Sequence, residues 1–440
     1  MATNKHFLIA GAGIAGLGAA LALGRRGHQV TLLEQAVQLG EVGAGVQLGP
    51  NAMRVLAHWG LADAVLAKAC LPQAVAVRAA TSGRSISRML LGAAIAQRDG
   101  AAYATMHRAD LHAALLQAVQ ALPQVQMHLG QRVQSIQWDA SGVQVRSCAS
   151  KNGATDGVTY SATDSEGSDW QADALLGADG LWSAVRPALC GDAAPRATGH
   201  IALRAMLPAS AACDALKLSE VGVWWGEKLH VVHYAVSGGD WFNVVVLTEG
   251  LGQAAASQGW ALDDAAQMAQ ATQTIAALQV QMCPDLQSIL AAAQSHGFKL
   301  WHLYDRPAAP FQWSQALALA NQTAQGSALT AQRPPITLLG DAAHPMLPYL
   351  AQGAAMALED AAVLAACVDV ASSVSNVAGA FTQYEAQRSA RTARVVRTAK
   401  RNGQIFHLGW PWSVARDAVL ALKGTQTVGL PWLYGFDALQ

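Results

Sequence analysis

Near its amino terminus the sequence reads His6-Phe7-Leu8-Ile9-Ala10-Gly11-Ala12-Gly13-Ile14-Ala15-Gly16, an apolar strand followed by a glycine-rich turn. An Ala- and Leu-rich segment to about Arg26 continues it as a helix, and a second apolar strand, Val30 to Leu33, ends at Glu34. Glu34 follows the last glycine by 34 − 16 = 18 residues. A strand, a G-x-G-x-x-G turn, a helix and an acid-ended strand at this spacing predict a dinucleotide-binding βαβ unit.

The residue types of this unit suit a pyrophosphate. The glycines permit the tight turn and a close approach of the phosphates, whose charge the helix N-terminus stabilises. Glu34 is expected to accept hydrogen bonds from a ribose. Residues 6–24 carry no charged side chain, which could also describe a signal sequence or a membrane span. The glycines at 11, 13, 16 and 18 and the acid-ended strand that follows argue against both alternatives.

Composition narrows the class of protein. With 440 residues the chain can form two or three lobes around a large core. Only 13% of residues are charged, 52% are hydrophobic and the formal net charge is +0, so no global field attracts nucleic acid or acidic membranes. The six cysteines form no CxxC pair and the histidines no HExxH motif. We therefore expect a soluble, cytoplasmic protein without a disulfide framework, metal site or nucleic-acid partner.

Two more strands run into glycine-containing turns. Ala174 to Gly177 is followed by Ala178-Asp179-Gly180 and by Ser183, a candidate helix cap. Pro335 to Leu339 is followed by Gly340-Asp341, and a helix is predicted from about Ala354. In open parallel sheets, ligands bind outside the carboxyl ends of the strands. Three such junctions predict one extended dinucleotide lying across them.

Two further segments lie between these junctions. Gly43 to Asn51 is glycine-rich, with Asn51 placed to cap a helix over 52–58; it either lets the backbone approach a flat ligand or is an ordinary connector. Arg108 stands just before a helix, with Asp110 as its cap or first-turn acid, and is expected to meet a ligand. The stretch 149–168 is rich in Ser, Thr, Gly and Asp and is expected to be an exposed loop within a hairpin.

In order and separation, Gly11–Gly16, Asp179-Gly180 and Gly340-Asp341 resemble the three signatures of single-component FAD-dependent aromatic hydroxylases, the p-hydroxybenzoate hydroxylase fold. Within that superfamily, Tyr349-Leu350-Ala351-Gln352-Gly353-Ala354 and Trp432-Leu433-Tyr434-Gly435 are most similar to 3-hydroxybenzoate 6-hydroxylases, which make gentisate. The resemblance implies an α/β fold: a Rossmann-like FAD-binding domain, a substrate domain with a mixed or antiparallel sheet, and C-terminal helices.

The resemblance also implies domain boundaries and cofactor contacts. The FAD-binding domain is expected over 1–75, 100–190 and 331–370, the substrate domain over 76–99 and 191–330, and the helical region over 371–440. Glu34 would bind the adenosine ribose, Val133 would lie near adenine, Arg108 would reach the flavin, and Asp341 would hold ribityl hydroxyls. Asp179 and Gly180 would serve the pyrophosphate and NADH. The full set of implied cofactor residues is Gly11, Gly13, Ala15, Gly16, Glu34, Gln35, Val46, Arg108, Val133, Asp179, Gly180, Asp341, Pro348, Gly353 and Ala354.

The chemistry implied for this family needs NADH or NADPH, O2 and a dry site. Reduced flavin carries negative charge near N1 and C2=O, which the N–H groups of Gly353 and Ala354 at a helix start would stabilise. Oxygen then adds at flavin C4a, giving a hydroperoxide that water must not reach. Pro345 and Pro348 stiffen the loop over that site. For His344 a hydrogen bond within this loop is preferred over a catalytic role.

A strand over 229–236 is expected to supply the substrate residues. Because side chains alternate along a strand, His230, Val232 and Tyr234 share one face. His230 and Tyr234, roughly 13 Å apart, would bracket an aromatic ring rather than touch each other. We hypothesise that His230 removes the phenolic proton, while Tyr234 and Gln352 orient the ring and its carboxylate. The alternative is a hydrogen-bonded sheet histidine and an interfacial tyrosine without a role in catalysis.

The carboxyl-terminal part is predicted to be helical over 380–401. Its arginines at 388, 391, 394 and 397 and Lys400 recur every three residues and are expected to form a solvated or dimer-facing surface in a homodimer. Conversion of 3-hydroxybenzoate to gentisate is the preferred function. A decarboxylating salicylate 1-hydroxylase and a non-catalytic FAD-binding protein remain alternatives.

Overall fold

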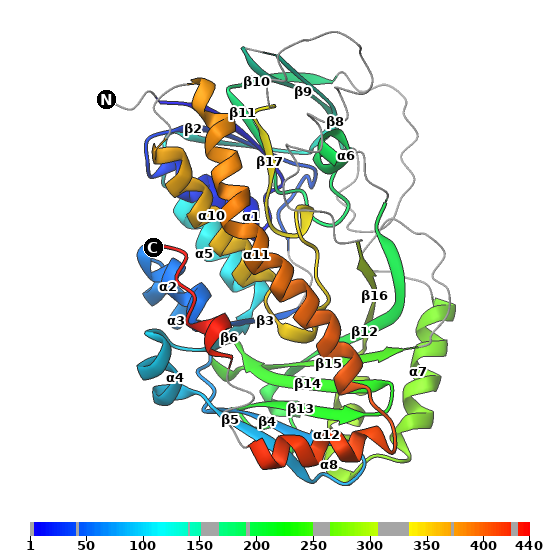
Figure 1. Ribbon diagram of the computed structural model, residues 1–440. Helices are drawn as coiled ribbons and strands as arrows, with labels where there is room; N and C mark the ends of the chain where they lie inside the picture. The colour runs from blue at the N-terminus through cyan, green and yellow to red at the C-terminus, as the bar shows by residue number, and fades with distance from the viewer. Residues whose placement is uncertain are drawn as a thin grey trace.

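The computed structural model describes residues 4–40, 44–139, 141–150, 167–190, 194–249, 265–306, 334–370, 374–423 and 430–440 (Figure 1). Five parallel strands form the first sheet, in the order β17 (Ile336–Leu338), β11 (Ala174–Gly177), β1 (His6–Ala10), β2 (Gln29–Glu34) and β7 (Val125–Leu129). Its central strands are continuous apolar runs because both faces are covered. The expected Rossmann-like sheet is confirmed.

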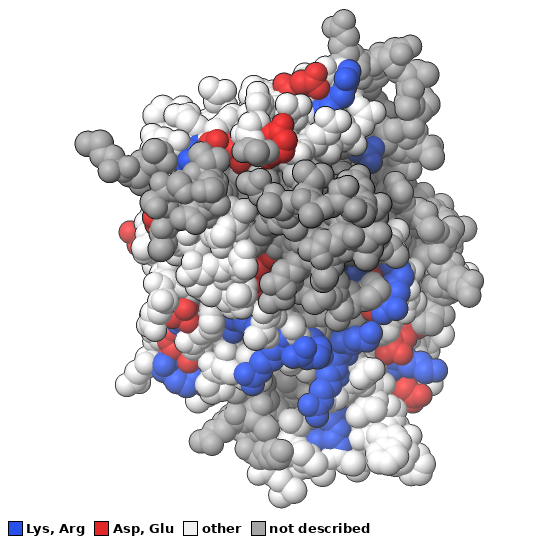
Figure 2. Space-filling view, turned by 45° about the horizontal axis from the view of Figure 1, so that its top comes forward, with Lys and Arg blue, Asp and Glu red and all other residues white. Residues whose placement is uncertain are grey.

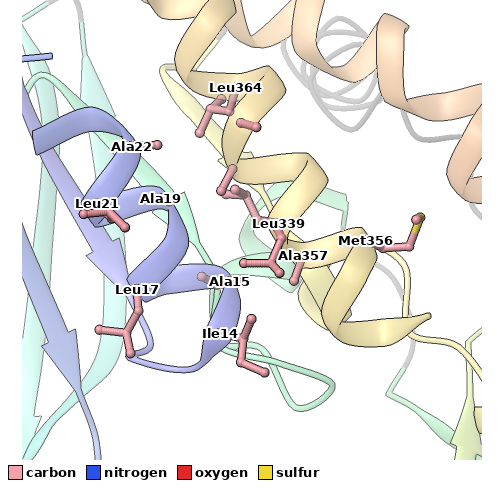
Figure 3. Close-up of a cluster of buried hydrophobic side chains, with 14 of the residues drawn as sticks. Ile14, Ala15, Leu17, Ala19, Leu21, Ala22, Leu339, Met356, Ala357 and Leu364 are labelled. Carbon is pink, nitrogen blue, oxygen red and sulfur yellow. The ribbon is translucent and has the colours of Figure 1, made fainter. Parts of the chain in front are cut away.

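Helices α1 (Ile14–Gly24), α5 (Arg108–Gln120) and α10 (Gly353–Val370) pack together beside this sheet (Figure 1). Small residues let α1 and α10 approach each other: a Cβ on Gly18 would lie 3.3 Å from the Cβ of Ala361. Figure 3 shows Ala15 of α1 near Leu339 and Ala357, all of them buried. The glycine-rich turn of β1 and the loop after β17 therefore share one core.

The second sheet has seven strands, in the order β16 (Lys299–Asp305), β12 (Arg196–Pro208), β15 (Trp241–Glu249), β14 (Leu229–Val236), β13 (Glu220–Gly226), β4 (Ala74–Ala79) and β5 (Ser85–Leu90). Only β13 and β4 pair in parallel, so the sheet is mixed, as expected. One face packs against α7 (Ala265–Gln279) and α8 (Pro284–Ser295). The opposite face meets the carboxyl-terminal helices.

The remaining strands form two small sheets. One contains β8 (Gln131–Asp139), β9 (Gly142–Ala149) and β10 (Ser168–Ala172), and the other contains β3 (Gly45–Leu48) and β6 (Ala104–His107). The short helices are α2 (Pro50–His58), α3 (Ala62–Leu66), α4 (Gly92–Asp99), α6 (Val185–Cys190), η1 (Ala209–Ala211), η2 (Ser237–Gly239), η3 (Gly340–Ala342) and η4 (Pro348–Leu350). The predicted hairpin around the 149–168 stretch exists as β9 and β10. Residues 151–166 of its loop lie outside the described part of the chain.

Helix α11 (Val374–Phe406) runs from the first sheet to the second, a length of about 50 Å at 1.5 Å per residue (Figure 1). Helices α12 (Trp412–Lys423) and α13 (Pro431–Tyr434) follow. The expectation of a solvated basic surface on α11 is wrong at two positions, because Arg388 and Arg391 are buried. Their partners, described below, are carboxylates too distant in sequence to be foreseen from the spacing.

The surface carries charges of both signs. In the view of Figure 2, Lys and Arg gather over the lower half with Asp and Glu beside them, and further acidic side chains lie near the top. Within the described residues, no helix combines the length and the apolar character that a membrane crossing requires.

Candidate active site

The three predicted turns meet at one edge of the first sheet. Strands β1, β11 and β17 are neighbours and parallel, so their carboxyl ends lie side by side. At Gly11, which has a φ of +99°, a Cβ would lie 2.5 Å from the Ala178 carbonyl oxygen. At Gly340 a Cβ would lie 3.0 Å from that of Ala15. Only glycine permits these contacts, and the predicted convergence is confirmed.

Three glycines at this edge face open space instead of protein. A Cβ added at Gly13, Gly180 or Gly353 would meet no atom within 4 Å. Gly13 caps α1, and Gly353 begins α10, so both lie at helix N-termini with unpaired N–H groups. We call the backbone around these three glycines the cradle. Because no side chain fills it and helix N-termini point into it, it is suited to a phosphate-bearing ligand.

Glu34 lies at the end of β2 beside this cradle. Its Oε2 accepts a hydrogen bond of 2.7 Å from the Ala12 N–H, and its Oε1 accepts one of 2.8 Å from the Ala36 N–H. The carboxylate therefore holds the glycine-rich turn in place. The adjacent Gln35 is exposed, and Val133 lies buried in β8, the strand that contacts β2.

Asp179 and Arg186 connect the second turn to the third. The Oδ2 of Asp179 accepts hydrogen bonds from the N–H groups of Ala184 (2.7 Å) and Val185 (3.2 Å), while burial raises the pKa of this carboxyl. Ser183 caps α6 by accepting from the Arg186 N–H, as predicted. The Arg186 guanidinium donates to the carbonyls of Ala342 (2.8 Å) and Ala343 (2.7 Å). One arginine thus fixes the loop that carries Asp341.

Asp341 lies partly buried within the electrostatic reach of Arg108. Burial raises the pKa of Asp341, and the charges of His344 and Arg108 act in the opposite direction. Arg108 begins α5, and its N–H donates to the Ala44 carbonyl (2.8 Å), next to β3, which contains Val46. The position of Arg108 at this edge of the sheet is consistent with the expectation that its side chain meets a ligand. His107, rather than Asp110, caps the helix, and Asp110 is the first-turn acid.

A buried polar network holds the start of α10. Asn51 donates to Gln352 Oε1 (3.0 Å) and to Glu359 Oε1 (2.7 Å). The prediction that Asn51 caps a helix is wrong, because α2 begins at Pro50 with Gly49 as its cap, and Asn51 faces the core. Gln352 is 2% exposed, so its carbonyl is engaged with Asn51 beneath the loop.

The same network contains two carboxylates and two arginines. Arg388 donates to Asp360 Oδ1 and to Glu359 Oε2, both at 2.7 Å, and Arg391 donates twice to Glu359 at 2.6 Å. Asp360 Oδ2 also accepts from the Gly340 N–H (2.9 Å) and lies 2.5 Å from His344 Nε2. The hydrogen bond expected for His344 was to the backbone of its own loop, whereas its Nε2 bonds the side chain of Asp360 on α10.

A cavity of about 810 Å³ lies between the second sheet and the carboxyl-terminal helices. Its walls are mostly apolar, and η4 with the following residue forms one side of it. Its lining includes His230 and Val232 of β14 and Pro348, Tyr349 and Ala351 of the loop before α10. The volume is ample for a substituted benzene ring, and such apolar pockets with few polar groups are typical of small-molecule sites.

His230 and Val232 of β14 line the cavity, whereas Val231 and Ala235, on the other face of the strand, belong to the opposite core. Tyr234 shares the face of His230, as the alternation predicts, but it is buried in the core of the first sheet and is not among the residues that line the cavity. His230 is 2% exposed, and burial, followed by the charges of His407 and His200, lowers its pKa well below the usual value. Burial raises the pKa of Tyr234 to about 12. A Cβ at Gly45 would lie 2.6 Å from the Tyr234 ring, so the second glycine-rich loop makes room for this tyrosine.

Two residues beside His230 have no signal in the sequence. His407 Nε2 lies 2.8 Å from His230 Nδ1, and His407 Nδ1 lies 2.5 Å from Glu249 Oε1. The three residues are separated by up to 177 positions, so only the fold brings them together. Tyr349 also contacts His230, with ring centroids 5.1 Å apart.

The residues at the sheet edge fit FAD. The open cradle at Gly13, Gly180 and Gly353 matches a backbone-bound dinucleotide, Glu34 lies beside it at the end of β2, and the cavity adjoins the loop before α10. Fold and site together define a dinucleotide-binding flavoprotein with a substrate domain.

Comparison with known proteins identifies the family. The family model described as "FAD binding domain" matches residues 5–399. The 3-hydroxybenzoate 6-hydroxylase of Klebsiella oxytoca is 32% identical over 448 residues, covering 99% of this chain and 98% of the relative. That of Polaromonas naphthalenivorans (strain CJ2) is 32% identical over 432 residues, covering 98% and 96%. The solved salicylate hydroxylase substrate complex shares the fold, with a TM-score of 0.72, 21% identity, and coverage of 99% and 96%.

The chain belongs to this family of FAD-binding proteins. The resemblance stated from the three motifs is therefore confirmed, together with FAD as the cofactor. The roles of individual residues remain proposals.

Proposed function

We propose that the protein is an FAD-dependent monooxygenase that hydroxylates a phenolic acid, 3-hydroxybenzoate to gentisate, with NADH and O2. The observation that carries this proposal is the position of His230, a buried imidazole in the wall of an apolar cavity that adjoins the flavin-side loop. The two 3-hydroxybenzoate 6-hydroxylases similar over nearly the whole chain support the choice of substrate.

When bound and reduced, FAD supplies the activated oxygen. The work of the chain is then to place the ring, ionise its hydroxyl and exclude water. A ring carbon para to a phenolate oxygen is strongly nucleophilic, so removal of the phenolic proton prepares the carbon that becomes hydroxylated. His230 takes this proton, because it is an imidazole facing the cavity.

The apolar walls orient the ring. Val232 and Tyr349 line the cavity on either side of His230 in the fold, and Pro348 stiffens the loop over it. Tyr234 and Gln352 are proposed to orient the ring and its carboxylate, Tyr234 from β14 and Gln352 from the loop that Asn51 braces. Water excluded by these walls cannot compete with the substrate.

The N–H groups at the start of α10 are proposed to face the flavin. Gly353 and Ala354 begin a helix of 18 residues, and a Cβ at Gly353 would occupy the open space. The partial positive charge of this N-terminus stabilises negative charge on the reduced ring system. Asp341 and Arg108 are proposed to contact the ribityl chain and the flavin from the opposite loops.

The test is a panel of hydroxybenzoates offered to the purified yellow protein. We expect 3-hydroxybenzoate to stimulate NADH oxidation and O2 uptake and to yield gentisate in equal amount. Release of equimolar carbon dioxide from salicylate would instead support the decarboxylating alternative. An FAD-binding protein whose NADH oxidation no phenolic acid stimulates would be a carrier and would contradict the proposal.

A homodimer and a cytoplasmic location are also proposed. Trp410, Trp412 and Leu422, at 82%, 68% and 87% exposure, provide apolar surface near α12 for a partner. Light scattering at micromolar concentration tests the dimer, and cell fractionation tests the location. The division into discontinuous FAD and substrate domains is a proposal that limited proteolysis can test.

A further inference from the structure

We propose that His407 and Glu249 form a proton relay with His230, which fixes the tautomer of His230 and holds the phenolic proton while the ring reacts. This inference rests on the proposed function, because it assigns the route by which that site ionises its substrate. Neither residue belongs to the FAD-binding motifs. His407 is 177 positions from His230 in the sequence, and Glu249 ends β15, the strand that follows and pairs with β14.

Hydrogen bonds connect the three residues in series. His230 Nδ1 and His407 Nε2 are 2.8 Å apart, and His407 Nδ1 and Glu249 Oε1 are 2.5 Å apart. His230 is 2% exposed and His407 is 6% exposed, whereas the Glu249 side chain is 32% exposed. The series therefore leads from the cavity wall to a carboxylate in contact with solvent.

The backbone holds both relay partners on one turn. Lys228, between β13 and β14, donates its N–H to the His407 carbonyl (3.1 Å) and accepts from the Glu249 N–H (3.1 Å). Lys228 has a φ of +55°, a conformation that costs a non-glycine residue about 1 kcal/mol. Lys228 lies in the tight turn between β13 and β14, where a positive φ is common, and its two backbone hydrogen bonds hold both partners near His230.

The carboxylate determines where the protons are. An ionised Glu249 can only accept, so Nδ1 of His407 carries hydrogen and Nε2 of neutral His407 accepts. His230 must then carry its hydrogen on Nδ1 and donate it to His407. The Nε2 of His230 is left as a lone pair, and no described residue is hydrogen-bonded to it. That is the tautomer a base facing a phenol requires.

Each step of the transfer balances. The phenol O–H bond breaks as the Nε2–H bond of His230 forms; the Nδ1–H bond of His230 breaks as the Nε2–H bond of His407 forms. The Nδ1–H bond of His407 then breaks as an O–H bond forms on Glu249. The negative charge has moved from Glu249 to the phenolate. When the product hydroxyl forms again, the proton returns by the reverse steps.

Because both histidines are buried, the proton is expected to move all the way to Glu249 and not to remain on His230 or His407. Burial is the largest influence on the pKa of His230 and of His407, and it lowers both, so an imidazolium is disfavoured at either position. Four titratable side chains surround His407: His230 from β14, Glu249 from β15, His200 from β12 and Tyr349 from η4. Only Glu249 among them ends the series with an anionic acceptor.

A metal ion at the same residues fits less well. His200, Glu249 and His407 offer ligand atoms within 4.8 Å of one another. Tetrahedral ligands about 2.1 Å from zinc lie roughly 3.4 Å apart. The 2.5 Å between His407 Nδ1 and Glu249 Oε1 is shorter than that separation and places the two atoms in direct hydrogen-bond contact. His200 Nδ1 is also engaged with the Tyr349 hydroxyl at 2.5 Å.

The tautomer is testable without turnover. In ¹⁵N-histidine-labelled holoprotein, with signals assigned from His230→Gln and His407→Gln, the wild type should show His230 protonated at Nδ1. Glu249→Gln offers an amide that can donate to His407, and the Nε2–H form of His230 should then appear. The relay would be overturned if His230 were protonated at Nε2 in the wild type. It would also be overturned if the tautomer of His230 were the same in Glu249→Gln as in the wild type. One equivalent of zinc in the purified holoprotein would overturn it too.

The pH profile of hydroxylation separates a proton role from a structural one. A phenol ionises unaided near pH 10, so a variant without the relay should gain rate about tenfold per pH unit toward that value. Glu249→Gln should be slower by about 10²-fold at pH 7 and approach wild type at high pH. His200→Gln, a neighbour outside the series, should stay within about threefold.

An equal loss at every pH, or no loss, would contradict the relay while leaving the hydroxylase intact. If the wild type hydroxylates no phenolic acid, the proposed function fails, and that result is distinct from the tautomer measurement.

Discussion

At the scale of single residues, two histidines of one strand illustrate what the sequence can determine. His230 and His233 lie three residues apart on β14, and strand alternation alone assigns them to opposite faces. The structure confirms this: His230 lines the cavity, whereas His233 lies close against Gly222, where a Cβ would be 2.0 Å from its ring. The partners of His230 could not be predicted, because His407 is 177 positions away and carries no motif.

His230→Ala should lose turnover by about 10²- to 10⁴-fold, because the base that ionises the phenol is removed. FAD content should remain at one per chain, because His230 lies on the substrate sheet and not on the cradle. Steady-state hydroxylation and the flavin absorbance of the purified variant measure the two effects. Near-normal hydroxylation would refute the assignment of His230.

Gly13→Ala should weaken FAD binding at least tenfold without destabilising the apoprotein. A Cβ at Gly13 meets no protein atom within 4 Å, so the methyl group would occupy ligand space. Gly16→Ala is the matched contrast, because its Cβ would lie 1.8 Å from the Gly11 carbonyl oxygen and disturb the fold itself. Calorimetric titration with FAD and apoprotein melting compare them. Equal FAD affinity in Gly13→Ala and wild type would place the cofactor elsewhere.

At the scale of elements, side chains tie neighbouring strands and helices together. Glu220 of β13 accepts from Arg78 of β4 (2.8 Å) and from Arg88 of β5. Burial alone would raise the pKa of Glu220, but the hydrogen bonds and charges of the two arginines outweigh it and lower the pKa to about 2. The Glu220 carboxylate thus connects β13, β4 and β5 at one edge of the second sheet, and we call this group of three residues the clamp.

The pH dependence of this clamp has a definite sign. A depressed pKa stabilises the folded state above the unfolded pKa, about 4.5, and this contribution is lost as pH falls toward about 2. Urea unfolding of wild type and Glu220→Gln should therefore show a stability gap at pH 6 that narrows between pH 4.5 and 2. A gap that is constant over this interval would mean that the clamp contributes no charge-dependent stability.

Helix α11 shows where spacing misleads. Five basic residues recur every three positions, yet Arg388 is fully buried against Glu359 and Asp360, and only part of the series is exposed. Arg388→Met should destabilise the protein by about 3–5 kcal/mol, because two carboxylates would lose a buried partner. Arg397→Met, at an exposed position of the same helix, should change stability by no more than about 0.5 kcal/mol. Equal effects in denaturant unfolding would contradict the buried network.

At the scale of the whole molecule, the sequence predicted the parallel sheet, the three converging turns and the mixed second sheet. The parallel sheet and the turns have local signals, which are glycine at a strand end and an acid at a fixed spacing, whereas the mixed sheet was implied by the family resemblance. The buried Asn51–Glu359 pair and the Glu249–His407–His230 series have none. Nothing in the sequence distinguishes these polar residues from others, because their contacts arise only in the folded chain.

The two sheets depend on one another for function. The first holds the cradle at its carboxyl edge, the second forms the cavity wall, and α11 runs along both (Figure 1). The loop Pro348–Ala351 lies between cradle and cavity, so a ring system bound at Gly353 would face a substrate held beside His230. The position of the flavin relative to His230 is thus the central geometric claim.

A crystal structure of the holoprotein with FAD and 3-hydroxybenzoate tests that claim most directly. We predict the isoalloxazine beside Gly353 and Pro348, with the phenol oxygen about 2.6–3.2 Å from His230 Nε2. A flavin bound away from these residues, or a phenol oxygen that faces another group while His230 points elsewhere, would contradict the account.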